Sequence, residues 1–130
     1  MAQIVEIDAL ITGRPSETAL AELRRRLTPD GDLLEWPFEE TVGLSHMVMA
    51  KDAPTPVALP MGTIAKGRLV LVLAEEPVRV YINGASTDPL FGRFLLYEAD
   101  ETTGITAVHV QNISSTTDIL IEYFIGGDIA

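Results

Sequence analysis

The chain has 130 residues, with 19 acidic against nine basic side chains and a formal net charge of −10 at pH 7. This length is typical of one domain with a single hydrophobic core, and the negative charge disfavours direct binding to nucleic acid and to anionic membrane surfaces. The absence of cysteine excludes disulfides, thiolate metal sites and cysteine nucleophiles. The sequence has no pattern of a signal peptide and no apolar run near the ~20 residues that span a bilayer, so we expect a cytoplasmic chain outside any membrane.

Residues 1–14 are expected to form a strand or an extended arm. Val5 and Ile7 alternate with Glu6 and Asp8, which is the period of an extended segment with one apolar side. Such an arm can add a strand to a partner protein.

Residues 15–28 are predicted to form one short helix. Leu20, Leu23 and Leu27 recur at helical spacing, and Pro15 suits the first turn. Three consecutive arginines, residues 24–26, would then lie near the end of the helix. They have two interpretations, a solvated helix terminus or a contact with an acidic partner or the acidic surface of a neighbouring copy.

The following segments predict an anchor residue, a strand and a sheet edge. Trp36 and Phe38 are interpreted as core or interface anchors, with ligand stacking as the alternative for Trp36. Residues 44–49 are predicted to form a short strand. Residues 52–60 contain three prolines, which lack an amide donor, so we expect an edge strand or an extended connection.

The C-terminal half is organised as apolar runs of strand length separated by turn residues. Residues 69–73 are continuously apolar, residues 78–82 alternate and end at Asn83, and alternation returns in residues 106–110 and 119–125. Together these runs predict a β-meander within an all-β fold. We expect a single domain over 1–130, an antiparallel β-sandwich of about eight strands with jelly-roll character and one short N-terminal helix.

Several of these strands carry apolar residues on both faces. The run at residues 69–73, the run at 94–97, and Leu120 with Phe124 all place apolar groups where a sandwich faces solvent. Exposed apolar surface of this kind is typical of protein–protein interfaces, so we expect an oligomer or an obligate subunit.

No constellation of residues predicts catalysis. His46 and His109 are the only histidines, each on an expected strand, and both are interpreted as structural. The neighbouring acids Glu75 and Glu76 would point to opposite sides of a strand, which does not make an acid–base pair. We therefore expect a chain that is not an enzyme and that has no cofactor or metal site.

The C-terminal half resembles the small β-sandwich structural proteins of tailed-bacteriophage particles. The strand and turn patterns of residues 77–84, 92–96, 104–112 and 119–127 carry this resemblance. It implies a non-enzymatic virion protein, most simply a capsid decoration or cement protein, with a tail or neck component as an alternative. The implied partners are the major capsid protein or another virion protein and further copies of the chain, a trimer being one candidate symmetry.

A carbohydrate-binding or adhesion module is the alternative from another class, with Trp36, Tyr81 and Tyr97 lining one face. If the chain is a structural virion protein, its candidate interface residues share apolar or cationic character and an expected position at the surface. They are Ile4, Val5, Ile7, Arg24, Arg25, Trp36, Phe38, Leu120 and Phe124.

Overall fold

A computed structural model describes residues 3–7, 10–13, 23–26, 34–84, 88–99 and 102–129 of the chain. The chain divides into two compact units, Met1–Phe38 and Glu39–Ala130. The single domain expected over 1–130 stays a prediction. The described part of both units consists of strands and connecting segments, which confirms the all-β class. No helix in the described part is long and apolar enough to cross a membrane.

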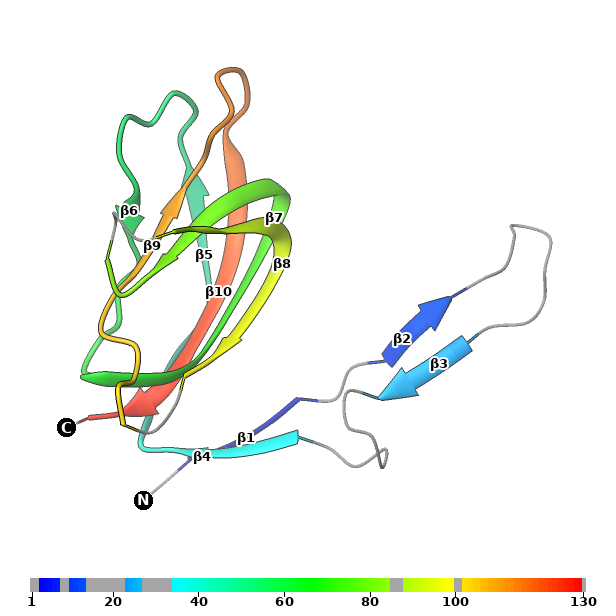
Figure 1. Cartoon of the computed structure of the whole chain (residues 1–130), viewed down its shortest axis with the longest axis vertical. Coiled ribbons are helices and arrows are strands. Elements are labelled where there is room, and N and C mark those ends of the chain that lie inside the picture. Colours follow the sequence, from blue (N-terminus) through cyan, green and yellow to red (C-terminus); the bar gives the residue numbers. More distant parts are fainter. Residues whose placement is uncertain are drawn as a thin grey trace. The chain divides into compact units, whose positions relative to one another are not determined.

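The second unit is an antiparallel sheet of six strands, in which the order is β5-β10-β7-β9-β6 and β8 pairs with the other side of β7 (Figure 1). Its strands are β5 (Glu40–Met49), β6 (Val57–Ala58), β7 (Lys66–Ile82), β8 (Leu90–Glu98), β9 (Val108–Gln111) and β10 (Ile119–Asp128). The short β6 lies at the end of this order, which confirms the proline-rich segment as a sheet edge.

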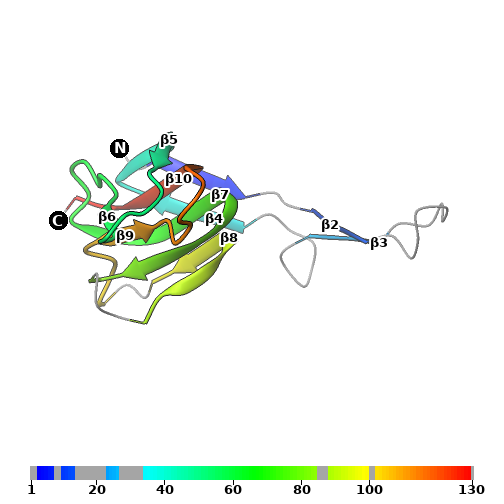
Figure 2. The ribbon, with the colours of Figure 1, turned by 90° about the horizontal axis from the view of Figure 1, so that it is seen from above.

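The sheet curls because β7 changes partners along its length. Residues 66–74 of β7 pair with β10, whereas residues 79–82 pair with β9. Strand β8 follows β7 on its other side, and the register between them shifts between Leu73 and Val78. Extra residues in one strand bend it and increase its twist, and Pro77 within this bulge lacks an amide donor. Figures 1 and 2 show the resulting curl of β7 and β8.

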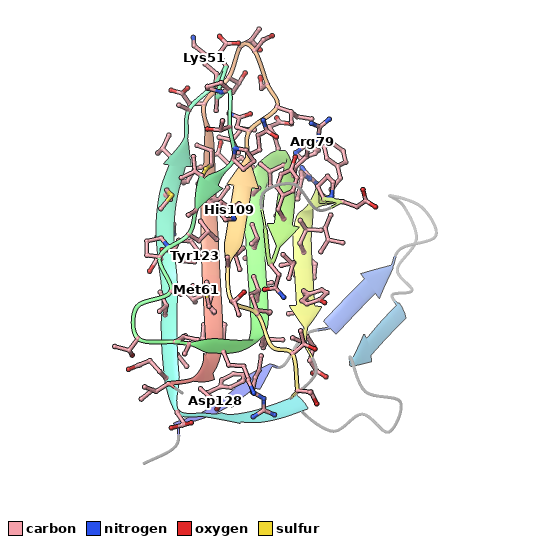
Figure 3. The ribbon with its side chains drawn as sticks, turned by 60° about the vertical axis from the view of Figure 1, so that its left-hand side comes forward. Lys51, Met61, Arg79, His109, Tyr123 and Asp128 are labelled. Atoms are coloured by element: carbon pink, nitrogen blue, oxygen red, sulfur yellow. The ribbon has the colours of Figure 1, made fainter. Side chains whose placement is uncertain are left out.

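The hydrophobic core lies inside this curl. Alternate residues of β10 point inward, and Ile119, Ile121 and Ile125 are fully buried. Val72 comes from the first half of β7 and Val80 from the second half, yet both belong to one buried cluster. Figure 3 shows Tyr123 of β10 and Met61 among the side chains of this unit. The curled sheet thus encloses one core, and the two halves of the bent strand β7 both contribute residues to it.

Glycine is required where β5 bulges opposite β10. Gly43 has a φ of 120°, and a Cβ atom there would collide with the backbone carbonyl of Tyr123. The register of β5 and β10 shifts between Tyr123 and Ile125 at the same level. The bulge therefore depends on a residue without a side chain.

One buried polar residue fixes the loop between β9 and β10. The Asn112 side chain is buried, and its Nδ2 donates to the carbonyl of Met49 at 2.9 Å and to that of Thr117 at 2.8 Å. Its Oδ1 accepts from the amide of Ser114 at 2.8 Å. The side-chain amide of Asn112 therefore links this loop to the end of β5, and both its Nδ2 and its Oδ1 atoms are hydrogen-bonded.

Most strands expected in the C-terminal half are confirmed, but one connection is wrong. Residues 69–73 and 78–82 were expected to be separate strands of a meander, whereas both belong to the 17-residue strand β7. The acids and the proline between them form a bulge rather than a turn, because the backbone continues in the same direction past β8.

The first unit consists of two separate two-stranded sheets in its described residues. One pairs β1 (Gln3–Ile7) with β4 (Leu34–Phe38), and the other pairs β2 (Leu10–Gly13) with β3 (Leu23–Arg26). The strand expected in residues 1–14 is thus present as β1 and β2. The helix expected over 15–28 is wrong at Leu23–Arg26, where pairing with β2 supplies the backbone hydrogen bonds. The rest of that range lies outside the described residues.

We predict that Asn112→Asp destabilises the protein by about 3 kcal/mol, because the variant loses both amide donations and places a carboxylate near two carbonyl oxygens. Urea unfolding followed by circular dichroism measures the change. The matched control is Thr116→Ala in the same loop, where the side chain is exposed and the expected change is within about 0.5 kcal/mol. Equal stability of Asn112→Asp and the wild type would contradict the role of Asn112.

Candidate interaction surface

The outer face is the side of β5, β10, β8 and the first half of β7 that points away from the core. Four large apolar side chains on it are exposed: Leu44 by 61%, Val48 by 62%, Leu120 by 40% and Phe94 by 63%. Half-buried apolar side chains lie at neighbouring positions, namely Leu71, Leu73 and Leu96. Exposed apolar area gathered in one place usually marks a contact with another molecule.

The register of the strands makes the outer face continuous. Leu120 of β10 lies opposite Val48 of β5. On β7, Leu73 lies opposite Phe94 of β8, and Leu71 lies opposite Leu96. Directly opposite residues on one face of a sheet lie ~5 Å apart at Cβ, so these side chains form one surface rather than scattered positions.

A contact between a histidine and a carboxylate lies on the outer face between β5 and β10. His46 of β5 and Glu122 of β10 are directly opposite each other, and His46 Nε2 lies 2.8 Å from Glu122 Oε2. Both side chains are partly exposed, so the pair contributes little to folding stability. Its importance is its position, since it places a carboxylate among apolar side chains.

A shallow groove of about 230 Å³ opens beside this pair. Its apolar walls come from Leu73 and Leu120, and its polar groups are His46, Glu75 and Glu122. The residues that line this groove include no lysine or arginine. The groove is therefore apolar and acidic together.

A second groove, of about 400 Å³, lies where the β7 bulge and the start of β8 meet the loop before β10. Phe91 and Ile113 supply exposed apolar surface, and Glu76, Ser114 and Thr117 supply polar groups. It has no histidine in its lining and only one acid. The first groove is the more specific site because its two carboxylates and its apolar walls can act on one ligand group.

Catalytic groups do not converge in the described residues. No group of three or more histidine, aspartate or glutamate side chains in that part of the chain can hold a metal ion. His109 lies on β9 opposite Tyr81, and its buried Nδ1 makes no hydrogen bond. The Tyr81 hydroxyl donates to Gln111 Oε1 at 3.1 Å. Tyr81 is buried, so its ring is not presented to a sugar as the carbohydrate-binding alternative requires.

The structure separates the predicted interface residues into three groups. Ile4, Val5 and Ile7 of β1 are paired in register with β4, which contains Trp36 and the buried Phe38. Arg24 and Arg25 lie on β3, paired with β2. Leu120 and Phe124 lie at outward positions of β10 in the second unit. Their role in an interface stays a prediction.

Of the four exposed apolar residues of the outer face, only Leu120 was among the predicted interface residues. Leu44, Val48 and Phe94 were not among the predicted interface residues, although alternation within residues 44–48 already placed Leu44, His46 and Val48 on one side of a strand. The acid that contacts His46 was also missed. Glu122 is far along the chain, and only the register of β5 against β10 brings it close.

No protein-family model matches the chain, and no significant match is found among curated proteins or among solved structures.

We predict that two neighbouring substitutions on β10 differ in their effect on folding. Ile121→Ala should cost about 2–5 kcal/mol, because Ile121 is fully buried in the core. Leu120→Ala should cost about 0.5 kcal/mol, because the Leu120 side chain lies on the outer face. Denaturant unfolding at low protein concentration, where association does not contribute, measures both. A larger cost for Leu120→Ala would mean that the outer face is part of the core.

Proposed function

We propose that this protein is a non-catalytic structural subunit that works by protein–protein contact through its outer face. One observation carries the proposal: four exposed apolar side chains of β5, β10 and β8 lie on one face of the sheet, where His46 of β5 also contacts Glu122 of β10. Burial of apolar surface is the main favourable term in most protein associations. A side of a sheet with this composition is stabilised when another protein covers it.

The resemblance of the C-terminal half to tailed-phage particle proteins specifies the proposal further. In this proposal the protein is a capsid decoration or cement protein, which resides in the virion and contacts the major capsid protein or another virion protein. A tail or neck component is the alternative position. A sheet surface that binds to a shell can stabilise it without catalysing a reaction. An exposed apolar face over a buried core is suited to such a contact.

The proposal includes a finer description of the fold, a β-sandwich with jelly-roll character. The supporting observation is that inner residues from the two halves of the curled sheet, such as Ile121 and Val110, belong to one buried cluster. Two layers that face each other across such a core are the basis of a sandwich. The second unit has six strands, which is near the expected number of about eight.

We predict that the wild-type chain forms a discrete oligomer and that Phe94→Ser/Leu120→Ser weakens it. Replacing two exposed apolar side chains removes the area that association would bury, while the core is unchanged. Sedimentation velocity over a concentration series measures the assembly. The matched control is Val57→Ser/Ile113→Ser, two exposed apolar residues outside the outer face, which should associate as the wild type does. A wild-type chain that stays monomeric at about 100 μM, a concentration at which micromolar affinities are saturated, would contradict self-association through the outer face.

We also predict that particles purified from the virus whose genome encodes the chain contain it in many copies. A decoration protein follows the repeats of a shell, so quantitative mass spectrometry should find it in a constant ratio to the major capsid protein. A constant but low copy number would favour the tail or neck position. Absence from intact particles would overturn the virion assignment.

A further inference from the structure

The strands β2 and β3 form what we call the arginine ribbon, Leu10–Gly13 paired with Leu23–Arg26. Its register places Arg24 opposite Thr12, Arg25 opposite Ile11 and Arg26 opposite Leu10. In the described residues this ribbon is a sheet of two strands only. An isolated two-stranded sheet is marginally stable in water, so the ribbon gains most from packing on another surface.

The charges on the outer face determine which partner surface is electrostatically favourable. Glu122 lies on it and Glu75 lines its groove. A second outer face is a poor partner, because it would bring the carboxylates of two copies together, and juxtaposed like charges oppose association. The arginine ribbon has the opposite character, since it contains the only run of consecutive basic residues in a chain of charge −10.

The chemistry of the groove matches an arginine side chain. The aliphatic stem of arginine packs along apolar walls such as Leu73 and Leu120, while its guanidinium group bonds to carboxylates. Only the Oε2 atom of Glu122 is engaged by His46, so a guanidinium can approach the Oε1 atom of the same group. Charge-assisted hydrogen bonds of this kind are about twice as strong as neutral ones.

We propose that the arginine ribbon of one copy docks on the outer face of a second copy, with an arginine of β3 in the groove beside Glu122. This inference rests on the proposed function and names the partner of the same surface. The contact joins two different surfaces, so it is head-to-tail. Such a contact gives a ring when the rotation between copies closes and a filament when it does not.

The experiment uses two full-length variants that each lose one half of the contact. The ribbon variant is Arg24→Glu/Arg25→Glu/Arg26→Glu, and the face variant is Phe94→Ser/Leu120→Ser. By sedimentation velocity each variant alone should associate about thirtyfold more weakly than the wild type or worse. Mixed in equal amounts, they should form a complex of one ribbon variant and one face variant that grows no further, because only one intact ribbon and one intact face meet.

Controls separate this contact from loss of folding and from net charge. Thermal unfolding by circular dichroism should give the same transition for both variants and the wild type at low concentration. The charge control is Lys51→Glu/Arg79→Glu/Arg93→Glu, which reverses three exposed basic residues outside the ribbon and should associate more strongly than the ribbon variant. As a milder variant, Glu122→Gln should weaken association, whereas Glu39→Gln at another exposed site should not.

The outcomes distinguish the two proposals. Absence of the chain from intact particles overturns the proposed function, and a monomeric wild type overturns the docking of the ribbon on a second copy. If the wild type is oligomeric and the ribbon variant associates as strongly as the charge control, only the docking of the ribbon is overturned. Failure of the mixed variants to form the one-to-one complex, while each alone is folded and monomeric, also overturns it.

Discussion

The bend in β7 is the constraint on which the rest of the second unit depends. A single strand forms ladder hydrogen bonds with β10 before the bend and with β9 after it, so both halves of the sheet share one backbone. The bulge at the bend interrupts pairing with β8 but does not end the strand. The inner residues of both halves therefore face one another across a core that a single curled sheet encloses.

A sheet that curls on itself can cover only one of its faces. The inner face of β10 is filled by Ile119, Ile121 and Ile125, whereas Leu120 on the alternate position remains exposed. Strand β7 before its bend carries leucine or valine on both faces, which is typical of strands covered on both sides. The second unit supplies its own cover on the inside, so the outside is the side where another chain gains most by binding.

The parts of the fold that sequence predicts are those with a local cause. Alternation in residues 78–82 and 119–125 identifies strands because the side chains of a strand point to two faces in turn, and the turn at Asn83 follows from its tolerance of positive φ. The continuity of β7 was not predictable in this way, since two acids and Pro77 are typical of a turn as well as of a bulge. Leucine spacing in residues 20–27 suits a helix, but helical propensity is weak and pairing with a neighbouring strand overrides it at Leu23–Arg26.

The candidate site depends on register, which is why so little of it was predictable. His46 and Glu122 meet because β5 and β10 pair with a bulge at Gly43, and a shift of β5 by one residue would turn His46 to the core face and away from Glu122. The same register places Leu120 beside Val48 and thereby joins separate apolar residues into one surface. The acidic groups of the outer face then decide what kind of partner is suitable. A face that is apolar with embedded carboxylates binds poorly to a copy of itself and well to a segment that is apolar and cationic, so this charge pattern favours head-to-tail assembly over a symmetric pair.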